Sequence, residues 1–152
     1  MDRPVRTLLV ALLVAGSCAA PPRPAGTPPP DFALGLSVRG AAGTALAPAW
    51  YIVEADGTLR AGLGVRHERT PAPGLVRVLR PDERAEVWRL AAAIDADAPG
   101  AVSAGAPGPG EGSFYLARDG RRSTVVLDEI DARPDVARLA ARLAELAWVS
   151  PP

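Results

Sequence analysis

The chain has 152 residues, of which 48% are hydrophobic and 22% charged, with equal numbers of basic and acidic side chains. This length and composition suit one domain with a hydrophobic core, and the balanced charge gives no bulk attraction to polyanions. All 17 basic side chains are arginines, and the sequence has no Lys, Asn or Gln, one His and one Cys. A Walker-type phosphate loop, a lysine Schiff base, a Cys/His zinc site and a Cys-x-x-Cys redox pair are therefore excluded for a single chain, and we expect no metal or cofactor.

The N-terminal segment has the charge pattern of an export signal. Arg3 and Arg6 precede the uncharged apolar run TLLVALLVA (7–15), which is too short to span about 30 Å of hydrocarbon. Small residues then lead to Cys18 in the sequence AGSC. This combination resembles the lipobox of bacterial lipoprotein precursors. The resemblance implies cleavage between Ser17 and Cys18, a diacylglycerol on the Cys18 thiol and a further acyl chain, such as palmitate, on its new amino group.

The sequence departs from the usual lipobox at Ala15, where Leu is most frequent, and ordinary secretion with cleavage after Ala19 stays open. The single Cys favours lipidation, because an unpaired thiol is a liability in an oxidising compartment. Two acyl chains already anchor a protein stably without a membrane-spanning helix. Because Ala19 rather than Asp follows Cys18, resemblance to enterobacterial lipoproteins implies the outer membrane, facing the periplasm, if the host has two membranes.

We divide the chain into a signal peptide (1–17), a lipidated Cys with a Pro-rich tether (18–30) and a single α+β domain (31–152). The tether includes PPRPAGTPPP (21–30), in which six of ten residues are proline. Such a segment favours polyproline II, which rises about 3.1 Å per residue and acts as a semi-rigid spacer.

Alternating apolar residues predict a first strand with Phe32, Leu34, Leu36 and Val38 on its inner face. The pair Asp56-Gly57 predicts a hairpin with a two-residue type I′ turn. With that turn, one face of the hairpin would carry Trp50, Ile52, Leu59, Ala61 and Leu63. We expect this face to be buried and the opposite face, with Tyr51, Val53 and Arg60, to point away from the core.

The rest of the domain repeats the same kinds of element. A short strand (75–79) precedes a helix that begins at Pro81 and runs to about residue 94, followed by a Gly-, Ala- and Pro-rich connection (95–112). Asp119-Gly120 predicts a second hairpin, with an inner face of Phe114, Leu116, Val125 and Leu127. A last helix from Pro134 has an apolar stripe of Val136, Leu139, Ala140, Leu143, Leu146 and Ala147.

These elements predict an α+β fold, with a mostly antiparallel sheet of five or six strands and two helices packed on one face. The order of hairpins and helices is also similar to that of small bacterial envelope domains without assigned function. That resemblance implies no active site.

Four groups of residues are candidates for chemistry. His67 is the only imidazole, Asp95, Asp97 and Gly100 begin like a calcium loop, and residues 60–89 hold seven arginines against four acidic residues. An acidic cluster consists of Asp128, Glu129, Asp131 and Asp135. Each group also has a structural explanation. His67 would lie in an exposed loop, Asp95 and Asp97 at a helix exit, and the arginines on a solvated face. The acidic cluster would favour a helix N-terminus electrostatically.

The function that we expect is a non-catalytic, lipid-anchored envelope protein whose domain binds another protein or an envelope component. The membrane contact would be the lipid on Cys18, and nucleic acid is not an expected partner. The alternative is a small envelope hydrolase that uses the acidic cluster or His67.

Overall fold

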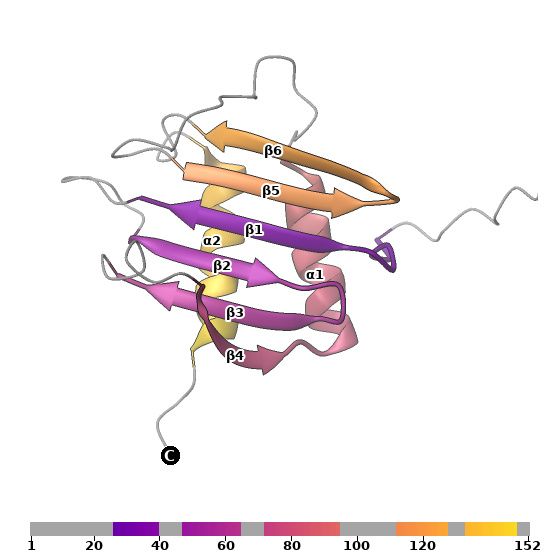
Figure 1. Cartoon of the computed structure of the whole chain (residues 1–152), viewed down its shortest axis with the longest axis horizontal. Helices are drawn as coiled ribbons and strands as arrows, with labels where there is room; N and C mark the ends of the chain where they lie inside the picture. Colours follow the sequence, from indigo (N-terminus) through magenta and orange to yellow (C-terminus); the bar gives the residue numbers. More distant parts are fainter. Residues whose placement is uncertain (1–25, 40–46, 65–71, 95–111, 128–132, 149–152) are drawn as a thin grey trace, which may run out of the picture.

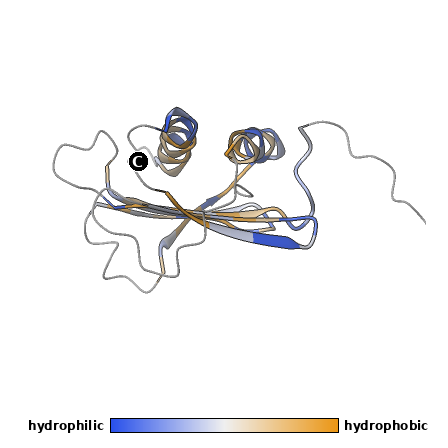
Figure 2. Ribbon diagram, turned by 90° about the horizontal axis from the view of Figure 1, so that it is seen from above, coloured by the Kyte–Doolittle hydropathy of each residue, from blue (hydrophilic) through white to orange (hydrophobic). Residues whose placement is uncertain are grey.

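The computed structural model describes residues 26–39, 47–64, 72–94, 112–127 and 133–148, which form a six-stranded antiparallel sheet and two helices (Figure 1). Both helices lie on the same face of the sheet (Figure 2), so the predicted α+β class is confirmed. The elements, in chain order, are β1 (Ala33–Val38), β2 (Ala49–Val53), β3 (Thr58–Leu63), β4 (Gly74–Val78), α1 (Pro81–Ala92), β5 (Gly112–Arg118), β6 (Arg121–Leu127) and α2 (Pro134–Ala147).

Strand β1 lies in the middle of the sheet, between two hairpins. The order of the strands is β4-β3-β2-β1-β5-β6, and every neighbouring pair is antiparallel. The β2–β3 hairpin therefore extends the sheet on one side of β1, and the β5–β6 hairpin extends it on the other. Because a lone hairpin is marginal in water, this central strand and the two helices give both hairpins the partners that they need.

The core lies between the sheet and the helices. In β1 the alternation predicted from the sequence is confirmed, because Phe32, Leu34, Leu36 and Val38 are all buried. In α2 all six residues of the predicted apolar stripe are buried as well. The Phe32 ring also contacts α1, with its centroid 5.2 Å from that of Trp88 in an edge-to-face arrangement.

The prediction for the first hairpin was wrong by one residue. The strands pair Val53 with Leu59 and Ile52 with Arg60, so that the chain turns over three residues rather than two. The Gly57 N–H donates to the Glu54 carbonyl at 2.9 Å. Among the three loop residues, only Gly57 has a positive φ, of 89°. This geometry is a type I turn followed by a glycine bulge, the usual form of a three-residue hairpin loop.

The side chain of Asp56 favours the longer turn. Its Oδ1 accepts the backbone N–H of Thr58 at 2.8 Å, and this hydrogen bond holds the pKa of Asp56 below its ordinary value. The changed register inverts β2 relative to the prediction, because side chains alternate between the two faces of a strand. In β3 the prediction holds for Leu59, which is buried, and for Arg60, which lies on the opposite face. The buried residues of β2 are Ala49, Tyr51 and Val53, and burial raises the pKa of the Tyr51 hydroxyl.

The second hairpin has the predicted two-residue turn. Asp119 and Gly120 both have positive φ, 49° and 73°, and Arg118 pairs with Arg121. The carboxylate of Asp31 accepts both turn amides, from Asp119 at 2.9 Å and from Gly120 at 2.7 Å. The predicted inner face is confirmed, since Phe114, Leu116, Val125 and Leu127 are buried.

Candidate functional site

No described element covers the face of the sheet opposite the helices (Figure 2). The strand registers place its side chains in rows that cross the sheet. One row contains Leu75, Arg60, Ile52, Gly35, Tyr115 and Thr124. The next row contains Gly62, Trp50, Ser37, Ser113 and Val126. We call this surface the open face.

Small residues on the central strand make a groove along the open face. The outward residues of β1 are Ala33, Gly35 and Ser37, whereas the neighbouring strands carry larger side chains. A depression of about 480 Å³ lies there, and its lining includes Gly35, Trp50, Ile52 and Tyr115. Neighbouring strands lie about 4.8 Å apart, so the backbones of β2 and β5 stand about 10 Å apart across β1.

The groove continues toward the β5–β6 turn. A second depression, of about 300 Å³, shares Ala33, Ala55 and Tyr115 with the first and is also lined by Arg121 and Arg122. Arg122 pairs with Ala117 across β5 and β6, which places it on the open face. We call the two depressions together the β1 groove; its apolar part lies over Gly35 and its basic end lies at Arg122.

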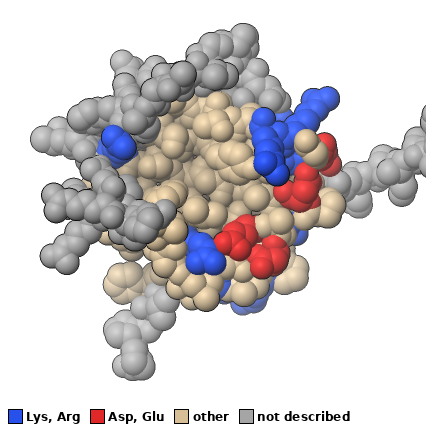
Figure 3. Space-filling view, in the orientation of Figure 1, with Lys and Arg blue, Asp and Glu red and all other residues tan. Residues whose placement is uncertain are grey.

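Much of the open face is uncharged (Figure 3), and the carboxylate that lines its larger depression, that of Glu54, is ion-paired with Arg60. Arg121 and Arg122 are exposed, and neither has an ion pair or hydrogen bond within the described ranges. Asp31 lies beside them in the groove lining, but its two oxygens accept the turn amides. Arg121 pairs with Arg118 and points to the helix side of the sheet, where it lies near Trp88. The basic end of the groove therefore presents the Arg122 guanidinium to an anion.

Another depression, of about 640 Å³, lies between residues 26–28 and the start of α1. Arg84 lines it, but its Nη2 donates to the carbonyls of Pro29 at 3.2 Å and Ala55 at 3.0 Å. The Arg84 guanidinium also lies 5.7 Å from the centroid of the Phe32 ring. These contacts fasten the end of the predicted tether to the domain, so we interpret Arg84 as a structural residue.

Most of the predicted catalytic and metal-binding candidates lie outside the described residues. This holds for His67, for Asp95, Asp97 and Gly100, and for Asp128, Glu129 and Asp131, as well as for Ser17 and Cys18. Only Asp135 of the acidic cluster is described. Its Oδ2 accepts a hydrogen bond from Nη2 of Arg133 at 2.7 Å, and this contact lowers the pKa of Asp135.

The pKa of Asp135 predicts an acid-sensitive contribution to stability. Because the folded-state pKa is below the ordinary value of 3.8, the ionised carboxylate stabilises the fold above that pH. The contribution is lost as the pH falls through the lowered pKa. We therefore expect Asp135→Asn to reduce the free energy of unfolding more at pH 7 than at pH 2, in urea titrations of both chains. An equal loss at both pH values would contradict this assignment.

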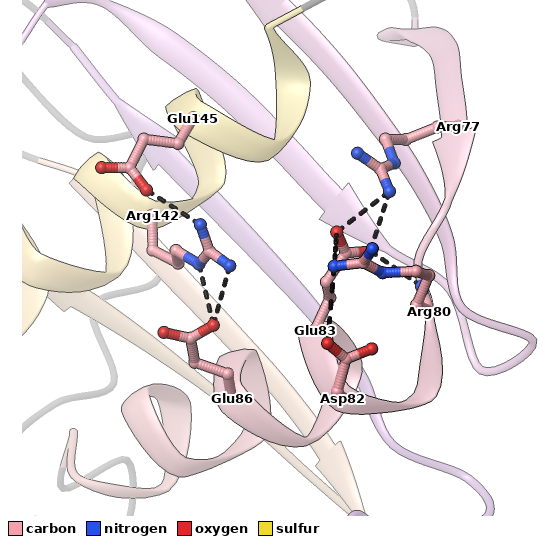
Figure 4. Close-up of polar contacts among 7 residues, drawn as sticks. All are labelled: Arg77, Arg80, Asp82, Glu83, Glu86, Arg142 and Glu145. Carbon is pink, nitrogen blue, oxygen red and sulfur yellow. Dashed lines mark hydrogen bonds and ion pairs between the residues drawn. The ribbon is translucent and has the colours of Figure 1, made fainter.

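The arginines of residues 60–89 are mostly paired within the domain. Arg60 forms an ion pair with Glu54 of the same hairpin, at 2.5 Å between Nε and Oε1. On the helix side, Arg77 and Arg80 both contact the buried carboxylate of Glu83, and Arg80 also contacts Asp82 (Figure 4). The excess of arginine in this part of the sequence therefore does not form a free basic surface among the described residues.

A second group of charges joins the two helices. Arg142 of α2 donates to Glu86 of α1 at 3.0 Å and to Glu145 at 2.9 Å (Figure 4). Both carboxylates raise the pKa of Arg142, which stays protonated. Within the part of the chain that the structure describes, no group of three His, Cys, Asp or Glu side chains is placed to hold a metal ion.

Sequence reasoning missed the β1 groove because it assigned Trp50 and Ile52 to the core. The signal was present in β1, where the residues between the buried ones are all small: Ala33, Gly35 and Ser37. The basic end was missed because Arg122 belongs to the second hairpin, whereas the excess of arginine in the sequence is in residues 60–89.

No protein-family model, curated protein or solved structure matches this chain. Neither described helix has the length and apolar character that crossing a membrane requires.

Proposed function

We propose that this protein is a lipid-anchored component of a bacterial cell envelope and that its domain is a non-catalytic binding module. In this proposal Cys18 carries the lipid, and the open face of the sheet is the binding surface. The observation that carries the binding role is the β1 groove, in which aromatic and apolar side chains surround a glycine floor next to Arg122, which has no ion pair among the described residues.

The composition of the groove supports a binding role. Protein interfaces are enriched in Trp, Tyr and Arg, and these residues supply most of the binding energy where they cluster. Trp50, Tyr115 and Arg122 come together here from β2, β5 and β6. The apolar side chains of this face are only partly buried in the isolated domain, so a partner that covers them would remove further apolar surface from water.

The hydrolase alternative has less support from the described residues. General acid–base catalysis needs a carboxylate or imidazole that is free to reach a substrate. Glu83, Glu86 and Asp135 are each engaged by an arginine. His67 and the other members of the acidic cluster lie outside the described residues, so no geometry favours a catalytic role for them.

The lipid anchor is tested by replacing Cys18. We expect Cys18→Ser to move nearly all of the protein from the membrane fraction to the soluble or secreted fraction, because the acyl chains supply the membrane affinity. The measurement is cell fractionation with a high-salt wash and mass spectrometry of the N-terminal peptide. Ser17→Thr, which keeps the thiol, is the control. Normal processing and membrane retention of Cys18→Ser would disprove the lipoprotein assignment.

The binding surface is tested by filling the groove. Gly35 has no positive φ, and a Cβ added there would lie 3.5 Å from the Tyr115 Cβ, an ordinary contact. Gly35→Val should therefore fold, and its side chain should occupy the apolar part of the groove. With the full lipidated chain as bait in solubilised membranes, we expect cross-linked partners of the natural chain to be lost with Gly35→Val. Retention of every partner would show that binding uses another surface.

A further inference from the structure

The β1 groove has two chemically different parts at a fixed spacing. The apolar part is centred on the row of Gly35, between Ile52 and Tyr115. The basic end is centred on the row of Ala33 and Ala117, to which Arg122 belongs. These rows are two residues apart along β1, which corresponds to about 7 Å in a strand.

An extended peptide has the same spacing between side chains on one of its faces. Side chains two residues apart point to the same side and are also separated by about 7 Å. One residue of such a segment can therefore place an apolar side chain over Gly35 while the residue two positions away faces Arg122. The groove runs along β1, so the segment would lie over the strand rather than across it.

The charge of the basic end selects the second side chain. Most described arginines already contact a carboxylate or a carbonyl, as in the pairs of Arg60, Arg77 and Arg142. Arg122 has no such contact within the described ranges, and Asp31 beside it is engaged by the turn amides. A guanidinium pairs most favourably with a carboxylate, because its planar donors match the two oxygens.

We propose, building on the binding role proposed above, that the β1 groove binds an extended acidic peptide segment of a partner protein. Its recognition element is a large apolar side chain and a carboxylate two residues apart, in either chain direction. The apolar side chain occupies the depression bounded by Trp50, Ile52 and Tyr115, and the carboxylate pairs with Arg122.

The shape of the groove favours a peptide over a small ligand. Sites for small molecules generally enclose most of the ligand surface. Here the strands provide a floor and two walls, and the open face offers no roof among the described elements. A long ligand that makes many contacts along one side suits such a surface better than a compact ligand does.

The test uses the full chain in a mild detergent and a fluorescent probe peptide, GSFSESGS, measured by fluorescence polarisation. We expect saturable binding, weaker by about tenfold or more when Phe is replaced by Ser or Glu by Gln in the probe. Added salt should weaken binding of the Glu probe and not of the Gln probe, because only the former forms the ion pair. A probe with Lys in place of Glu should not bind.

Matched variants of the protein assign each half of the probe to its part of the groove. Gly35→Val and, independently, Tyr115→Ser should weaken binding about tenfold through the apolar part. Arg122→Glu should reverse the preference, so that the Lys probe binds and the Glu probe does not. Arg138→Glu is the charge control, since Arg138 is exposed on α2 and should leave both probes unaffected. Circular dichroism verifies that each variant is folded.

Several results would overturn the inference. They are absence of binding, equal binding of the Glu, Gln and Lys probes, and Arg122-dependent attachment to phosphatidylglycerol vesicles without peptide binding. Self-association of the chain that Gly35→Val abolishes would identify a second copy as the occupant instead. If partners in membranes are lost with Gly35→Val but no probe shows an acidic preference, the peptide chemistry is wrong and the proposed binding surface still holds.

Discussion

Truncation of Leu143 to alanine is expected to lower the free energy of unfolding by about 2–5 kcal/mol, the usual effect of removing a buried leucine side chain. Leu143 is fully buried in the stripe of α2 that packs on the sheet. The truncation removes apolar contacts and leaves a cavity that the surrounding side chains fill only in part. Because a domain of this size has only about 5–15 kcal/mol of stability, the loss is large.

The matched control for this prediction is Leu75→Ala, which deletes the same atoms on the edge strand β4. Leu75 is 65% exposed, so little apolar surface returns to water and we expect a change of about 0.5 kcal/mol or less. The measurement is urea unfolding of the full chain in a mild non-ionic detergent. Equal losses for the two variants would mean that α2 does not cover the core as described.

Removal of the Glu83 carboxylate is expected to be the most damaging charge change on α1. Glu83 is 5% exposed, and its Oε2 accepts the backbone N–H of Arg80 at 2.8 Å at the start of the helix. The same oxygen accepts a hydrogen bond from Nη2 of Arg77 in β4 at 2.8 Å. It therefore caps the helix and joins it to the edge strand. We expect Glu83→Ala to cost about 1–3 kcal/mol, since both the cap and the partner of a partly buried arginine are lost.

Asp82→Ala is the matched control for Glu83→Ala. Asp82 occupies the preceding position of the same helical turn, but its side chain is 73% exposed and its contact with Arg80 is long, at 3.4 Å. We expect a change of at most about 0.5–1 kcal/mol, from the weak surface pair and the helix dipole. Thermal and urea unfolding of both variants distinguish the two roles. A loss for Asp82→Ala as large as that for Glu83→Ala would show that only charge at the helix N-terminus matters.

The two hairpins show how far local sequence determines a register. Both have an Asp-Gly pair, and the same two-residue turn was predicted for each. At Asp119-Gly120 the prediction is confirmed, and the Asp31 carboxylate binds both turn amides from another part of the chain. At Asp56-Gly57 the Asp side chain instead binds the Thr58 amide, and the loop gains a residue. Apolar residues on both faces of β2 left the choice to tertiary packing.

The sequence by itself determined the helices and strands of this protein and the buried residues of β1, of the second hairpin and of α2. The alternation in β1 and in the second hairpin, and the stripe of α2, are strong enough that only one face can be buried. The basic, apolar and small-residue pattern before Cys18 likewise predicts an anchor from sequence alone. Each of these signals is local, because it depends on residues within one element.

The tertiary structure decided which face of β2 turns outward, and therefore where the candidate binding surface lies. The groove needs Gly35 from β1, Trp50 from β2, Tyr115 from β5 and Arg122 from β6 in neighbouring rows. Such a row depends on strand order and register, which are set by long-range pairing. No periodicity within one strand contains that information, and a shift of one residue in a turn exchanges core and surface.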